Sequence, residues 1–227
     1  MNVPDLSPLW VTLHLAGVTT VILLLLGTPI AWWLARTRSP IKPAVEAVTA
    51  LPLVLPPTVL GFYLLIILSP TSPIGGFWVS VTGEALTFSF AGLVVASVLY
   101  SLPFTVQPLE AAFESVGRGP IEAAASLGAS PFDAFLNVVL PMSLRGFLTA
   151  AVLTFTHTLG EFGVVLMVGG NIPGVTRTAS ISVYDSVQAF DQVAAGRTSL
   201  LLLGFSLVVL TLTYALQRHG GPGWARP

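Results

Sequence analysis

The sequence predicts an all-α integral membrane protein in which five transmembrane helices form a single bundle. Hydrophobic residues make up 54% of the chain and charged residues only 8%, whereas about a quarter of an ordinary globular domain is charged. Mean hydropathy is +0.86. The apolar residues gather in five runs, each long enough to cross about 30 Å of hydrocarbon as a helix, and none alternates like a barrel strand. The runs are Leu9–Ala35, Ala44–Leu68, Leu86–Val106, Gly146–Val168 and Ser199–Leu216.

Charge and composition exclude several classes of function. The net charge is −1, so no basic patch indicates nucleic acid binding. The chain has no cysteine, which excludes disulfides and thiolate metal sites. The opening residues MNVPDLSP lack the basic region of a cleavable signal peptide, so we expect the first apolar run to remain in the mature protein.

The loops between the runs predict a topology. We expect residues 9–216 to form one transmembrane domain and residues 217–227 a short cytoplasmic tail. Basic loop residues mark the cytoplasmic side of a membrane protein. Two of them, Arg177 and Arg197, fall on one side, and the others fall on the opposite side: Arg36, Arg38, Lys42, Arg118, Arg145, Arg218 and Arg226. This count places the N-terminus outside, the C-terminus in the cytoplasm and the loop at 110–143 on the cytoplasmic side.

The second run, with LPLVLPPTVLGF, contains Pro52, Pro56, Pro57 and Gly61. Proline removes a backbone donor and clashes with the preceding turn, so this helix must break or kink. Freed carbonyls at membrane depth need protein or a wet cavity beside them. The break is therefore either a packing kink or part of the wall of a pathway.

The fourth run brings polar residues into apolar surroundings with TFTHTLGEFG. Thr154, His157, Thr158 and Glu161 follow the spacing that places side chains on one helix face. An acid at membrane depth normally faces a cavity or the bundle interior. Two interpretations remain open, a translocation route and a hydrogen-bond network between helices. Zinc needs a third ligand, and neither cysteine nor an H-E-x-x-H pattern is present, so no metal site is predicted.

The stretch IEAAASLGASPFDAFLNVVLP, between the third and fourth runs, predicts two short helices. Pro120 suits the first turn of one helix, and Gly128 suits a left-handed C-terminal cap. Ser130 can cap the next helix, with Pro131 at its first position and Pro141 at its end. An apolar stripe along the second helix is formed by Phe132, Phe135, Leu136, Val139 and Leu140. The first helix offers a shallow alanine surface that a protein partner can cover closely; the alternative is a simple connector.

These residues resemble a known family. EAAASLGASPFDAFLNVVLP is similar to the EAA loop of ABC importer permeases, and LPLVLPPTVLGF, TLGEFG and GNIPGVTRT resemble more narrowly the molybdate/tungstate permeases, which are close to the sulfate permeases. The resemblance covers residues 12–216. It implies the type I importer fold, two permease copies that form the pathway, a cytoplasmic ATPase dimer docked on the EAA loops, and an extracytoplasmic binding protein that delivers the oxyanion.

The resemblance also implies roles for particular residues. It places ATPase coupling on Glu122, Ala123, Ala124, Leu127 and Gly128. The proline break and the polar stripe independently make Pro56, Pro57, Thr154, His157, Thr158 and Glu161 the candidate residues of the pathway or its gate. Relatives often carry Glu where Val175 stands and Arg where His157 stands.

The residues support a separate ATPase independently. Lys42 is the only lysine, and no G-x-x-x-x-G-K-[ST] phosphate loop exists, so another chain must handle ATP. Import of a dianion against a negative-inside potential costs about 4.6 kcal/mol per 100 mV.

The alternative function within the transporter class is a sulfate/thiosulfate permease. A passive channel would not need the EAA loop, and a membrane enzyme would need a nucleophile with its base or a metal triad, neither of which can be assembled from three histidines.

Overall fold

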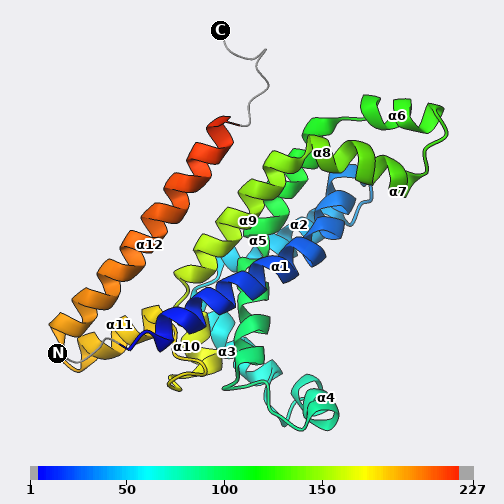
Figure 1. The fold of residues 1–227 in the computed structure, drawn as a ribbon. Helices are drawn as coiled ribbons and strands as arrows, with labels where there is room; N and C mark the ends of the chain where they lie inside the picture. The colour runs from blue at the N-terminus through cyan, green and yellow to red at the C-terminus, as the bar shows by residue number, and fades with distance from the viewer. Residues whose placement is uncertain (1–4, 220–227) are drawn as a thin grey trace.

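The long helices of the protein set its membrane-spanning frame. A computed structural model describes residues 5–219, and within this range every regular element is a helix (Figure 1). Three helices are long and apolar enough to cross a membrane: α1 (Ser7–Arg36), α5 (Phe90–Val116) and α12 (Gln192–His219). Of the predicted tail at 217–227, residues 220–227 lie outside the described part of the chain.

Two bent helix pairs complete the set of spans. Helices α2 (Lys42–Val54) and α3 (Pro57–Ile67) meet at 112°, and the run Pro131–Met142 meets α9 (Leu144–Leu159) at 72°. With each pair counted as one span, the described residues contain up to five spans. The predicted break in the second run is confirmed, because Pro56 has an extended backbone at φ −55° and ψ 136° between α2 and α3.

The fourth apolar run corrects one prediction. Residues 146–168 were expected to form one helix, but α9 ends at Leu159 and a separate helix, α10 (Gly163–Gly169), follows. Glu161 lies in the break and therefore is not on the helix face that carries Thr154. The helix breaks because the backbone of Phe162 is not helical, with φ −135° and ψ −66°. The break lets α10 turn away and pack beside α3, where Gly163 lies against Pro57.

The segment between α5 and α9 forms the predicted pair of short helices. These are α6 (Gly119–Ser126) and a run composed of α7 (Pro131–Ala134), a π-helical turn η1 (Phe135–Val139) and α8 (Leu140–Met142). Gly128 has φ +89°, and the Ser130 hydroxyl accepts a hydrogen bond from the Asp133 N–H at 3.2 Å, so both predicted caps are confirmed. Pro141 does not end the run, which continues to Met142, because a proline is tolerated in the first turn of α8.

The core lies where α1, α5 and α9 pack together. One buried cluster joins Leu34 of α1, Leu109 and Phe113 of α5, and Ala150 of α9. Small residues allow helices to approach closely in membrane proteins; a Cβ added to Gly27 would lie 2.9 Å from Thr105 Cγ2. Helix α12 stands beside this core and contacts mainly α11 (Ala179–Gln188), while α4 (Pro73–Thr82) projects from the bundle (Figure 1).

Candidate functional site

A seam of hydroxyl groups joins α5 to α9. On α5, Ser97, Ser101 and Thr105 recur every four residues and are fully buried. Thr105 Oγ1 lies 2.5 Å from Thr154 Oγ1, and Ser101 Oγ lies 2.9 Å from Thr158 Oγ1. The three α5 residues were not predicted from the sequence, although hydroxyl side chains at intervals of four in an apolar run are the signal that would have found them.

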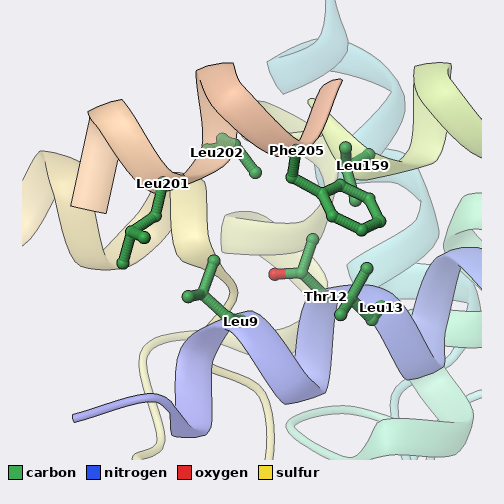
Figure 2. Close-up of a pocket in the computed structure, with 7 residues that line it drawn as sticks. All are labelled: Leu9, Thr12, Leu13, Leu159, Leu201, Leu202 and Phe205. Carbon is green, nitrogen blue, oxygen red and sulfur yellow. The ribbon is translucent and has the colours of Figure 1, made fainter. Parts of the chain in front are cut away.

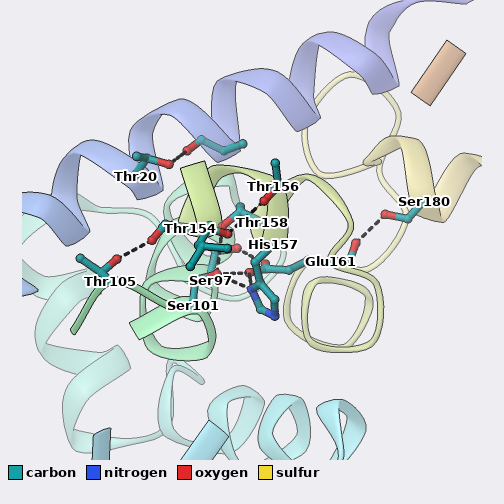
Figure 3. Close-up of polar contacts among 12 residues, drawn as sticks. Thr20, Ser97, Ser101, Thr105, Thr154, Thr156, His157, Thr158, Glu161 and Ser180 are labelled. Atoms are coloured by element: carbon teal, nitrogen blue, oxygen red, sulfur yellow. Dashed lines mark hydrogen bonds and ion pairs between the residues drawn. The ribbon is translucent and has the colours of Figure 1, made fainter. Parts of the chain in front are cut away.

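Glu161 is the acid of this seam. Its Oε2 accepts a hydrogen bond from Ser97 Oγ at 2.5 Å, and its Oε1 accepts one from Ser101 Oγ at 2.6 Å. Its backbone carbonyl accepts a further hydrogen bond from Ser180 Oγ at 2.5 Å (Figure 3). The side chain is 1% exposed. A buried carboxylate is costly unless hydrogen bonds satisfy it, so these donors explain how an acid is held at this depth.

His157 borders the seam and is more accessible. Its Nδ1 lies 2.8 Å from Ser101 Oγ and 3.6 Å from Glu161 Oε1. The imidazole ring stacks on Phe104 with centroids 3.9 Å apart, and Tyr100 lies 4.8 Å away. The side chain is 20% exposed, so one edge of the ring is held by the seam and the other remains open.

An open pocket of about 560 Å³ lies in front of this histidine. Its wall comes from α3, α5, the end of α9 and the start of α10. The lining residues are Pro57, Thr58, Tyr100, Thr156, His157, Gly160, Glu161, Phe162 and Gly163. The structure thus brings the proline break of the second run to the polar residues of the fourth.

The predicted pathway residues fall into two groups. Pro57, His157 and Glu161 line the pocket. Thr154 and Thr158 are buried against α5 instead, and Pro56 precedes the lining residues and provides the extended backbone at the break. Both interpretations of the polar stripe therefore have a structural counterpart, since the network between helices also forms one wall of the pocket.

A second cavity differs in chemistry. It measures about 200 Å³ and lies between the N-terminal end of α1 and α12 (Figure 2). Its lining is leucine and phenylalanine apart from Thr12: Leu9, Thr12, Leu13, Leu159, Leu201, Leu202 and Phe205. The Thr12 hydroxyl is already occupied, because it donates to the Pro8 carbonyl and accepts from the Ala179 N–H, both at 2.7 Å. This cavity suits apolar groups and offers nothing to an anion.

The predicted coupling residues lie on an exposed helix at one end of the bundle, away from α10 and α11 (Figure 1). Helix α6 buries none of its residues, and the Leu127 side chain beyond it is 90% exposed. Glu122 and Ala123 are exposed and Ala124 is half-buried. An exposed leucine beside small residues leaves a surface that a partner can cover.

The same end of the molecule holds a cluster of charges. Lys42 Nζ lies 3.3 Å from Glu46, 3.3 Å from Glu110 and 3.5 Å from Glu114 carboxylate oxygens. The cluster ties the start of α2 to the end of α5. It was not predicted from the sequence, which identified Lys42 as the only lysine and as one of the basic residues of the cytoplasmic loops. Within residues 5–219, no group of three or more His, Asp or Glu side chains is placed to hold a metal ion.

Comparison with known proteins identifies the family. The sequence profile described as "Binding-protein-dependent transport system inner membrane component" matches residues 27–225. The chain belongs to this permease family. The permease is 55% identical over 214 residues to the molybdenum transport system permease protein ModB of Azotobacter vinelandii, covering 94% of this chain and 95% of the relative. It is 34% identical to the sulfate transport system permease protein CysT of Synechocystis, covering 93% of this chain and 72% of that one.

The fold of the permease is also found in a solved structure. The MetNI methionine ABC transporter in an inward-facing conformation matches with a TM-score of 0.71 at 20% identity, over 95% of each chain. The five-helix bundle of the type I ABC importer permeases, expected from the sequence, is therefore confirmed. The permease is a multi-pass membrane protein.

Proposed function

We propose that this permease forms the membrane pathway of an ATP-driven importer of molybdate, with tungstate as a second substrate. The observation that carries the proposal is the 55% identity, over nearly the full length of both chains, to a molybdenum transport permease. The sulfate transport permease is more distant at 34% identity. Sulfate and thiosulfate are therefore the alternative substrates.

We infer that the pathway passes the pocket in front of His157. The pocket is polar on the side of the seam and is open. The adjoining face of α3 exposes Phe62, Tyr63 and Ile66, a surface that a second copy of the permease would cover. In this proposal two copies form a homodimer, residues 9–216 of each act as one transmembrane domain, and the two pockets face a shared route.

The exposed helix α6 at one end of the molecule supports a proposal for the remaining partners. The loop at 110–143 would receive a cytoplasmic ABC ATPase dimer, with Glu122, Ala123, Ala124, Leu127 and Gly128 at the contact. ATP hydrolysis would take place on that separate subunit, and the permease itself would be non-catalytic. An extracytoplasmic molybdate-binding protein would deliver the anion at the opposite end. This arrangement requires the N-terminus outside and the C-terminus in the cytoplasm of the cytoplasmic membrane.

Deletion of this chain tests the substrate assignment. High-affinity uptake of molybdate and tungstate should be abolished, and sulfate uptake should be largely retained. Complementation with the intact chain should restore molybdate uptake. Loss of sulfate uptake with molybdate uptake intact would instead identify a sulfate permease.

A further inference from the structure

The hydrogen bonds around Ser101 determine which nitrogen of His157 carries a hydrogen. A carboxylate only accepts hydrogen bonds, so Ser101 uses its single hydroxyl hydrogen for Glu161 Oε1, at 2.6 Å. The Ser101 oxygen then has only lone pairs left for His157 Nδ1 at 2.8 Å and for Thr158 at 2.9 Å. With Glu161 ionised, His157 Nδ1 therefore carries the hydrogen and donates it to Ser101.

The other ring nitrogen faces the pocket. Figure 3 shows the Nε2 side of the His157 ring directed away from the hydroxyl cluster, and His157 lines the pocket. Among the described residues, the structure gives Nε2 no hydrogen-bond partner. In a neutral imidazole with a protonated Nδ1, Nε2 is an acceptor. It then presents a lone pair to the pocket and no positive charge.

The charge of the pocket wall depends on this nitrogen. The titratable side chains that line the described pocket are Tyr100 from α5, His157 from α9, and Glu161 from the break after α9. With Tyr100 and His157 neutral, the wall carries the negative charge of Glu161 and repels a dianion. A proton on Nε2 places an imidazolium 3.6 Å from Glu161 Oε1, which balances that charge and turns Nε2 into a donor. Charge-assisted donors are strong ligands for anionic oxygens.

We propose that His157 is the residue of this pocket that contacts the oxyanion, and that it does so only with a proton on Nε2. Each passing dianion then requires a protonated His157, and Glu161 acts as the positioning residue that orients the ring through Ser101 and stabilises its charge. The inference rests on the proposed function, because it requires that the chain carries an oxyanion.

The test is the pH profile of molybdate uptake by the complete importer in proteoliposomes, with the same buffer inside and outside. The uptake rate is divided by the ATPase rate at each pH, so that pH effects on the partners cancel. The ratio should fall with rising pH for the wild type, because loss of the Nε2 proton removes the donor that contacts the oxyanion. In His157→Asn the ratio should be low and independent of pH.

Two further variants make the test specific. Glu161→Gln removes the carboxylate that stabilises the imidazolium, so the ratio at the higher pH should lie below that of the wild type. His14→Gln is the matched control: His14 stacks on Phe90 at 4.6 Å, outside the pocket, and its removal should leave the wild-type profile. A fall with rising pH that persists in His157→Asn, or a ratio at the higher pH that is unchanged or raised in Glu161→Gln, overturns the inference and leaves the proposed function intact. No molybdate uptake by the wild type at any pH overturns the proposed function itself.

Discussion

At the scale of single residues, Ser101 links three other residues of the polar seam. It contacts Glu161, His157 and Thr158 from the centre of α5. Ser101→Ala would leave these groups without their shared partner. Loss of a buried hydrogen-bond partner in a membrane protein costs about 1–2 kcal/mol, so we expect a lower free energy of unfolding in detergent and altered transport.

Ser115→Ala is the control for this prediction. Ser115 lies on the same helix, but it is exposed and its hydroxyl donates to the carbonyl of Ala112 within that helix. Its removal should change stability by less than about 0.5 kcal/mol. Equal thermal denaturation of the two variants would contradict a stabilising role for Ser101.

Gly128 carries the second prediction at this scale. Its φ of +89° is a conformation that branched side chains resist, and a Cβ there would meet no atom of this chain within 4 Å. Gly128→Val should therefore alter the backbone after α6 without disturbing the bundle, and the spans should still insert. We expect weaker co-purification of the ATPase or ATP hydrolysis that no longer drives uptake.

Gly128→Asn separates conformation from bulk. Asparagine tolerates a left-handed backbone far better than valine does, so this variant should retain most ATPase binding. If both variants lose binding equally, the added volume is responsible. If both retain full binding and uptake, the loop is a connector and not a coupling element.

At the scale of elements, the contact between α10 and α3 closes one side of the pocket. A Cβ on Gly163 would lie 2.9 Å from Pro57 Cβ, too close for the two helices to keep their positions. Gly163→Ala should cost about 1–3 kcal/mol, the usual effect of added volume at a tight contact. Gly160→Ala is the matched control, because the nearest atoms to its Cβ are backbone oxygens at 3.8 and 3.9 Å.

Thermal unfolding and molybdate uptake measured on the two glycine variants check this contact. Gly163→Ala should be less stable and should transport more slowly, while Gly160→Ala should retain the thermal stability of the wild type. Wild-type stability and uptake in Gly163→Ala would show that α10 can move away from α3 without consequence for the pocket.

At the scale of the whole molecule, the prediction concerns orientation in the membrane. The excess of basic residues beside α1, α2 and α6 indicates that this end faces the cytoplasm. A reporter fused to the C-terminus should be active only in the cytoplasm, and one fused to the N-terminus only outside. The opposite result would place α6 on the wrong side for an ATPase.

Much of the fold was predictable because its causes are local. Apolar length predicted the spans, the missing N–H of Pro57 predicted the break before α3, and Gly128 and Ser130 predicted the caps around α6 and α7. Each of these depends on a few neighbouring residues. The same local rules ended the second short helix at Pro141, one residue before its end at Met142. They also extended the fourth span past Leu159, where a contact between α10 and α3 decides the path of the chain.

The sequence by itself determined that this is a helical membrane protein, where its second span breaks and that an acid and a histidine enter its fourth apolar run. Only the tertiary structure decided what those two residues face. Glu161 bonds to Ser97 and Ser101, which lie 64 and 60 positions earlier in the chain, and helical periodicity carries no information about which hydroxyls on another helix will lie opposite. The physical reason is that a buried carboxylate requires hydrogen-bond donors, and the packing of the whole bundle decides which donors lie beside it.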